Sequence, residues 1–172
     1  MKLDYSKYYF LEGYLFDEVT NNFRKRKYLT LEEFFCIVIW KANRAKSKIK
    51  NKILKKRGSL ESNIKKLTEK IYKTRNNEEK LRILLEEWDF GLPMATAILT
   101  VLYPDIFSVY DIRVRNQLGI KDFSGRKDEI EKYFNEFLPV VTKQAGKSLR
   151  DKDRYLWGKD FYNALVKFIK SK

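Results

Sequence analysis

The chain has no histidine and a single cysteine, Cys36, among its 172 residues. Without histidine, Ser–His and Cys–His catalysis and any zinc site that depends on imidazole are excluded. One cysteine can form neither an intramolecular disulfide nor a metal cluster by itself, which is typical of a cytoplasmic protein. Any chemistry must therefore use carboxylates, lysines or water, and we expect no metal site.

Long apolar runs are also missing. No segment approaches the roughly 20 apolar residues that a membrane span requires. The N-terminus, which carries Asp4, lacks the apolar core of a signal peptide. We therefore expect a cytoplasmic protein with no membrane partner, associated with the nucleoid if the source is prokaryotic.

Positive charge is the most prominent property that the sequence does have. There are 37 Lys and Arg against 23 Asp and Glu, which gives a formal net charge of +14. Such a charge favours polyanions and releases counterions when they bind, so nucleic acid is the leading partner. The alternative is a surface that lysine merely solvates. A hydrophobic content of 44% is sufficient for one compact domain of this length.

Helical periodicity dominates the chain, and no run of alternating strand residues interrupts it. Thr30 and Glu33 predict a capping box at the start of one helix. Apolar residues then recur at helical spacing over residues 60–71, and Asn76 with Glu79 predicts a second cap. The fold class is therefore all-α.

The second half of the chain predicts further helices. A helical hairpin is expected over residues 81–103, and a short helix over 112–118. An amphipathic helix follows near 130–137, which Pro139 should end or kink. Ser148 and Asp151 predict a cap for a terminal helical region. The apolar anchors of this region are expected to be Tyr155, Trp157, Phe161, Leu165 and Phe168.

Two stretches, residues 88–99 and 109–114, carry the strongest functional signal. The first predicts a helix end, a tight turn in which Gly91 supplies conformational freedom, and a new helix with Pro93 at its start. The second is an apolar segment that leads to the carboxylate of Asp111. This aspartate can cap the helix that follows or face a ligand at the mouth of that helix.

In this order the two stretches resemble the helix-hairpin-helix DNA glycosylase superfamily, which includes endonuclease III and the 3-methyladenine glycosylases. Asp89, Phe90 and Gly91 stand where the family has its hairpin turn, and residues 94–99 stand in its second helix. When the pattern is aligned without a gap, the family's catalytic aspartate falls on Asp111, 20 residues after Gly91.

The resemblance implies one two-lobed domain over residues 1–172. One lobe covers about residues 30–130 and contains the hairpin at 81–103. The N-terminal residues 1–29 and the C-terminal helices over 131–172 form the second lobe. The cleft between the lobes should hold the catalytic aspartate.

The resemblance also implies a reaction. Backbone groups of Gly91, Leu92 and Met94 would hold a DNA phosphate, and the only cofactor considered is a monovalent cation at the hairpin. Asp111 would stabilise the sugar cation and activate water to hydrolyse the N-glycosidic bond of a flipped, damaged or modified base. Lyase-competent members carry a nucleophilic lysine where this chain has Pro93, so we expect a monofunctional glycosylase of base excision repair without AP-lyase activity.

Further DNA contacts are expected from the end of the capped helix and from a basic run. Lys41 and Asn43 are candidates for filling the gap left by the flipped base. Trp40 is either a core residue or an aromatic that stacks on a base. The remaining candidates for phosphate contact are Arg44, Lys46, Lys48, Lys50, Lys52, Arg113 and Arg115.

Other hypotheses remain open. Asp111 can be an N-cap and nothing more. Asp89, which replaces the first glycine of the family's turn, favours a non-catalytic DNA-binding protein with the same fold. A protein–protein adaptor with an incidentally basic surface is a third hypothesis. We expect duplex DNA as the partner and a monomeric protein.

Overall fold

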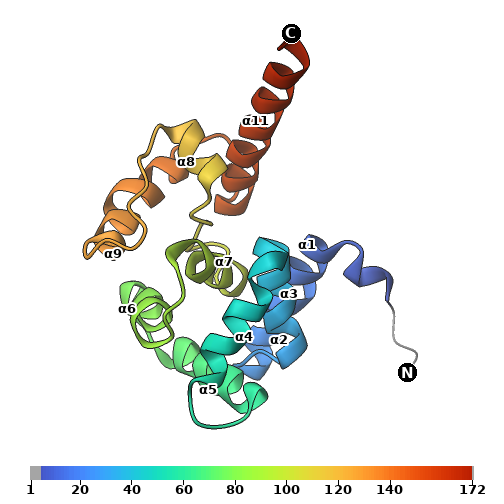
Figure 1. Cartoon of the computed structure of the whole chain (residues 1–172), viewed down its shortest axis with the longest axis vertical. Helices are drawn as coiled ribbons and strands as arrows, with labels where there is room; N and C mark the ends of the chain where they lie inside the picture. Colours follow the sequence, from blue (N-terminus) through green and yellow to red (C-terminus); the bar gives the residue numbers. More distant parts are fainter. Residues whose placement is uncertain (1–4, 172) are drawn as a thin grey trace.

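The computed structural model describes residues 5–171, and within that range the chain forms helices and no strand. The all-α fold class is therefore confirmed. Short 3-10 or π-helical turns, labelled η, connect or extend several of the α-helices (Figure 1). The elements are η1 (Ser6–Tyr8), α1 (Leu11–Gly13), η2 (Tyr14–Val19), α2 (Thr20–Arg26), α3 (Leu31–Ala42), η3 (Asn43–Ala45), α4 (Lys46–Leu54), α5 (Leu60–Lys73), α6 (Asn77–Arg82), η4 (Ile83–Glu87), α7 (Leu92–Leu102), α8 (Ile112–Leu118), α9 (Glu129–Lys132), η5 (Tyr133–Phe137), α10 (Leu138–Thr142) and α11 (Leu149–Lys170).

The predicted helix caps are present. At the start of α3, the Glu33 amide donates to the Thr30 hydroxyl at 3.2 Å, and the Thr30 amide donates to the Glu33 carboxylate at 2.9 Å. The Asn76 side chain accepts a hydrogen bond from the Glu79 amide at the start of α6, and Ser148 with Asp151 forms the capping box of α11. These local signals explain why the predicted helix starts are confirmed.

Helix α7 is the centre of the fold. Apart from Pro93, which is half-buried, all its residues are buried, and all except Thr96 and Thr100 are apolar. A helix of that composition must be surrounded by other elements. Figure 1 shows α7 in the middle of the molecule, where it packs on α2, α3 and α6.

The helices form two groups joined by residues 103–111. Helices α1 to α7 make the first group, and α8 to α11 make the second, in which α11 packs along α8 and α10 (Figure 1). The N-terminal segment was expected to join the C-terminal helices. In the structure, α1 packs on α3 and α2 packs on α7, and the segment reaches α11 through ion pairs of Glu12 with Arg150 and Arg154.

The second group has an aromatic core. Tyr133 and Phe137 of η5 stack against each other with centroids 5.6 Å apart, and Phe107 stacks on Tyr133. Pro139 lies in the first turn of α10, directly after the π-helical turn η5. The chain therefore changes from π-helix to α-helix next to Pro139, and the helical structure does not end there. None of the helices within residues 5–171 is long and apolar enough to cross a membrane.

One expectation about the C-terminal region is wrong. The terminal helix was expected to be anchored in the core by Tyr155, Trp157, Phe161, Leu165 and Phe168. All five are 41% to 77% exposed instead. For the last three of them the reason is that the last turns of α11 extend beyond the helices that its first half packs on (Figure 1). Leu156, in the first half, is the apolar residue of α11 that is buried.

Candidate functional site

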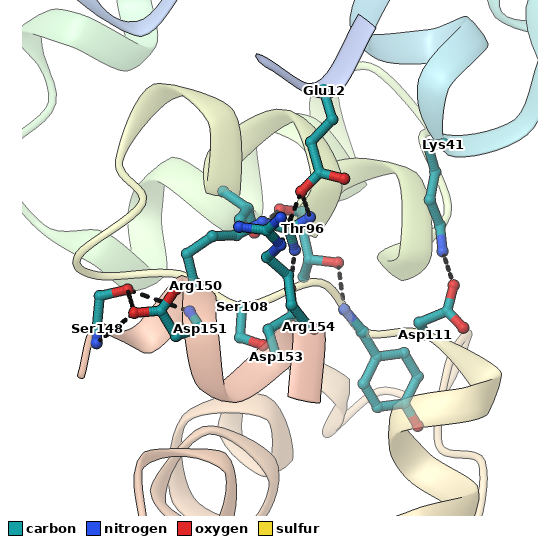
Figure 2. A network of polar contacts seen from close by, with 12 residues as sticks. Glu12, Lys41, Thr96, Ser108, Asp111, Ser148, Arg150, Asp151, Asp153 and Arg154 are labelled. Carbon is teal, nitrogen blue, oxygen red and sulfur yellow. Dashed lines mark hydrogen bonds and ion pairs between the residues drawn. The ribbon is translucent and has the colours of Figure 1, made fainter. Parts of the chain in front are cut away.

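A cavity of about 410 Å³ lies between the two groups of helices. It brings Asp111, the predicted catalytic residue, together with Trp40 and Lys41 from the end of α3. Figure 2 shows the polar side chains that meet here from α1, α3, the linker and α11. The residues that line the cavity are Glu12, Trp40, Lys41, Val109, Asp111, Arg150, Asp153, Arg154 and Trp157.

Asp111 is held in place from both sides. Its Oδ1 atom accepts a hydrogen bond from the Arg113 amide at 2.9 Å, which makes it the N-cap of α8. In the linker before it, the Tyr110 amide donates to the Thr96 hydroxyl of α7 at 3.0 Å, and the Ser108 amide donates to the Tyr133 hydroxyl at 3.0 Å. Asp111 can therefore cap α8 and face the cavity at the same time, because Oδ1 caps the helix while Oδ2 accepts from Lys41.

The second oxygen of Asp111 is paired with Lys41. The Nζ atom of Lys41 donates to Oδ2 of Asp111, across from α3 to α8 (Figure 2). The two side chains are only 12% and 18% exposed. Sequence reasoning expected Lys41 to contact DNA and missed this pair, because nothing local links residues that lie 70 positions apart.

Arg150 is a second residue that sequence reasoning missed. Its guanidinium donates to the Asp153 carboxylate and, at 2.7 Å, to the Glu12 carboxylate. It also lies over the rings of Phe16 and Trp40, 4.7 Å and 5.2 Å from their centroids, which are cation–π distances. Trp40 is therefore packed against Arg150 while it lines the cavity, so the core and the binding interpretations of Trp40 are compatible.

Asp153 ties α11 to the linker. Its side chain is almost completely buried, and it accepts from Arg150 and from the backbone amide of Val109. Burial raises the pKa of Asp153, and the Arg150 guanidinium acts in the opposite direction. Because Val109 lies two residues before Asp111, this contact helps to fix the position of the carboxylate in the cavity.

The turn between η4 and α7 differs from the expectation. Asp89 has the left-handed backbone conformation, with φ of 54°, whereas Gly91 is extended, with φ of −73°. A Cβ atom at Gly91 would meet only Pro93, at 3.9 Å. The expectation that Gly91 supplies the conformational freedom of the turn is therefore wrong, since Asp89 makes the reversal and aspartate tolerates that conformation better than most residues.

The Asp89 turn is held against α4 by one lysine. The Lys52 amine lies 2.9 Å from the Asp89 carboxylate and also donates to the Asp89 backbone oxygen. The hydrogen bond from Lys52 lowers the pKa of Asp89, and Lys55 and Lys48 act in the same direction. Lys48 stands four residues before Lys52 and Lys55, the C-cap of α4, three residues after it, so all three lie on one side of the helix. We call Lys48, Lys52 and Lys55 the hairpin-facing lysines.

The other predicted contacts near the hairpin have different surroundings. The side chains of Leu92 and Met94 are buried, so these residues can offer only backbone groups to a ligand. On α4, Ile49 and Ile53 are buried and Lys50 is exposed. Just before them, Lys46 donates to the Asn43 side chain at 2.7 Å, and both residues are exposed, as is Arg44.

Arg113 and Arg115 are engaged within the second group of helices. Arg113 forms an ion pair with Asp160 at 3.0 Å and lies over the parallel rings of Trp157 and Phe161. Arg115 is buried, with its guanidinium 3.2 Å from the Asp122 carboxylate and over the Tyr110 ring. Neither arginine lines the cavity.

Within residues 5–171, no three or more His, Cys, Asp or Glu side chains are grouped so that they could hold a metal ion. No protein-family model, curated protein or solved structure matches the chain. The structure thus defines an all-α protein with two groups of helices and a carboxylate–ammonium pair in the cavity between them.

Proposed function

We propose that this protein is a DNA glycosylase of the helix-hairpin-helix type that removes a damaged or modified base during base excision repair. The observation that carries the proposal is the Asp111 carboxylate, which is anchored at the N-cap of α8 and lines the cavity between the two groups of helices. The cavity of about 410 Å³ falls within the roughly 300–1,000 Å³ of small-molecule pockets and has room for one extruded base.

The chemistry suits a single carboxylate. As the N-glycosidic bond breaks, positive charge develops on the sugar, and a fixed anion stabilises that charge. The same carboxylate can orient the attacking water. In the free protein Lys41 neutralises Asp111. We infer that the Lys41 ammonium turns to a phosphate of the DNA strand when the sugar approaches Asp111, which keeps Lys41 as a DNA contact.

The basic surface supports a DNA partner. The net charge is +14, and the hairpin-facing lysines lie beside the turn whose backbone at Gly91, Leu92 and Met94 would hold a phosphate, with or without a monovalent cation. Asn43 and Arg44 are exposed beyond the end of α3 and can extend this contact.

We propose hydrolysis without strand cleavage because neither of two positions near the site, Pro93 and Lys41, offers a free amine as a nucleophile. The hairpin position of the lyase lysine is Pro93, which has no side-chain amine. The Lys41 amine is engaged by Asp111 in the free protein and, in this proposal, by a DNA phosphate in the complex, so it is not free to attack the sugar. Water is therefore the proposed nucleophile.

A single-turnover assay tests the proposal. Wild type, Asp111→Asn and Asp105→Asn are incubated with duplexes that each carry one damaged or modified base, and alkaline cleavage then reveals abasic sites. Asparagine is also a good N-cap, so Asp111→Asn should fold and bind DNA. Its rate of excision should fall about 100-fold or more, whereas Asp105→Asn, which removes an exposed carboxylate outside the cavity, should match wild type. Without alkali the strand should stay intact, and borohydride should trap no protein–DNA adduct.

A second candidate is a non-catalytic DNA-binding protein with the same fold. It is favoured by the ion pair of Lys41, which neutralises the carboxylate that catalysis needs. Strongly salt-dependent binding by wild type, with no abasic product from any duplex, would decide for this candidate. Weak binding without salt dependence would instead decide for a protein–protein adaptor.

A further inference from the structure

The last turns of α11 form an arm that extends beyond α8 and α10, with Phe161 at its base lying under the Arg113 guanidinium. The first half of the helix packs on α8 and α10, and Asp160 is bound to Arg113 and Gln117 at 3.0 Å and 3.3 Å. From residue 161 to 170 every residue is exposed except Val166, which is half-buried. Figure 1 shows this part of α11 extending away from all other labelled helices.

The arm has one broad apolar face. At about 100° per residue, its exposed apolar side chains cover a continuous arc of roughly 120°. They are 41% to 77% exposed. Asn163, Lys167 and Lys170 occupy the opposite side. An arc of this width is typical of a helix that buries one side against another element. We call the following residues the α11 apolar face: Phe161, Tyr162, Leu165, Phe168 and Ile169.

The spacing of residues along this face indicates a helix as its partner. Tyr155, Gly158, Tyr162, Leu165 and Ile169 follow one another at alternating intervals of three and four residues. This is the spacing of the seam along which two helices pack knobs into holes. A lipid surface requires an apolar arc but no such seam.

Gly158, on the same seam, supports a helix as the partner independently. A Cβ atom there would meet nothing within 4 Å, so the packing of this chain with itself does not require glycine. Glycine nevertheless weakens the interior of a helix. The close approach of a second helix gives a physical reason for glycine at this position.

The area of the face matches the interface of a dimer. An aromatic side chain presents about 150–250 Å², so the exposed fractions of the α11 apolar face leave roughly 600 Å² per chain. Two copies would bury about 1,200 Å², the lower end of the range for specific interfaces. The roughly 600 Å² of one chain lies at the upper end of the roughly 300–600 Å² found for the largest patch on a typical monomer, and such patches are often functional.

We propose that two copies of this chain associate through their α11 apolar faces as a pair of packed helices. The protein is then a dimer, in contrast to the monomer expected from the sequence. This inference is independent of the proposed function.

Sedimentation equilibrium tests the proposal on nucleic-acid-free protein at high salt. The wild type should have twice the chain mass of 20.7 kDa at micromolar concentrations. Leu165→Glu places a charge at the centre of the seam and should raise the dimer Kd at least about 30-fold. Asn163→Glu makes the same charge change on the opposite side of the same helix and should stay dimeric. Circular dichroism of equal helix content shows that both variants are folded.

Gly158→Gln gives a second test, because glutamine favours a helix but adds bulk to the seam. It should also weaken the dimer. A wild type that sediments at 20.7 kDa throughout overturns the proposal, as does a Leu165→Glu variant that stays dimeric. If the monomeric wild type binds phosphatidylglycerol vesicles and Leu165→Glu does not, the face belongs to a lipid surface and the proposal is wrong.

Discussion

Lys41 at the end of α3 and Asp111 at the start of α8 form an ion pair that joins the two groups of helices at their shared cavity. Both side chains are largely shielded from water, so each charge depends on the other for its solvation. The pair therefore connects folding to function, because the carboxylate proposed for catalysis is also part of the contact between the two groups.

This pair gives a prediction about stability. Lys41→Met should lower the free energy of unfolding by about 1–3 kcal/mol, since it leaves the Asp111 carboxylate without its partner. Asp111→Asn should cost less in the Lys41→Met background than in wild type, with a coupling energy of about 0.5–2 kcal/mol. Urea unfolding of the double-mutant cycle measures this coupling, with Lys50→Met as a control at an exposed lysine. Strictly additive effects would show that the pair contributes nothing to stability.

A second prediction concerns the turn. Asp89→Asn removes a negative charge beside the hairpin-facing lysines and keeps a residue that tolerates a positive φ. DNA affinity should rise several-fold at low salt, because the carboxylate no longer competes with phosphate for Lys52. Fluorescence anisotropy with a labelled duplex measures the change. Asp105→Asn changes the net charge equally elsewhere, and an equal gain from that variant would assign the effect to net charge alone.

A third prediction concerns acid. Hydrogen bonds from Ser148 hold the pKa of Asp151 below its ordinary value of 3.8. Because the folded-state pKa lies below the unfolded one, the capping box stabilises α11 fully above that value and loses its contribution as the pH falls through the folded-state pKa. Asp151→Asn should therefore be less stable than wild type near neutral pH, and the difference should shrink in acid.

Urea unfolding at about pH 6 and about pH 3 measures this difference. Glu131→Gln, which neutralises an exposed acid of α9, is the control. A stability difference between wild type and Asp151→Asn that is the same at both pH values would contradict the assigned role of the carboxylate.

The local parts of the fold could be predicted from the sequence. Thr30 with Glu33 and Ser148 with Asp151 determine their helix starts by bonds within four residues, and Asp111 was expected as an N-cap for the same reason. These bonds form within one helical turn, so a short stretch of sequence contains both partners.

The tertiary parts could not be predicted. The pairing of Lys41 with Asp111 and the stacking of Arg150 on Trp40 join distant segments whose approach depends on the packing of whole helices. The exposure of Phe168 was missed for a related reason. Apolar periodicity shows that a helix has an apolar face, but it does not show whether that face is covered by the same chain or by another molecule.

The final prediction separates the lysines of α4 by the side of the helix on which they lie. By helical spacing, Lys48 and Lys55 lie on the same side of α4 as Lys52, whereas Lys46 and Lys50 lie on the opposite flank of the buried stripe of Ile49 and Ile53. Lys48→Ala/Lys55→Ala should reduce the slope of log affinity against log salt by about 2, one unit for each lost phosphate contact.

Lys46→Ala/Lys50→Ala removes the same charge from the same helix and should reduce that slope less. Anisotropy titrations at several salt concentrations, with the same duplex for all proteins, give both slopes. Equal slopes for the two double variants would mean that DNA affinity depends only on the net charge of α4 and not on the side of the helix that carries it. The proposed phosphate site at the hairpin would then lose its support, because that site requires the lysines beside Asp89 to contribute more than lysines elsewhere on the helix.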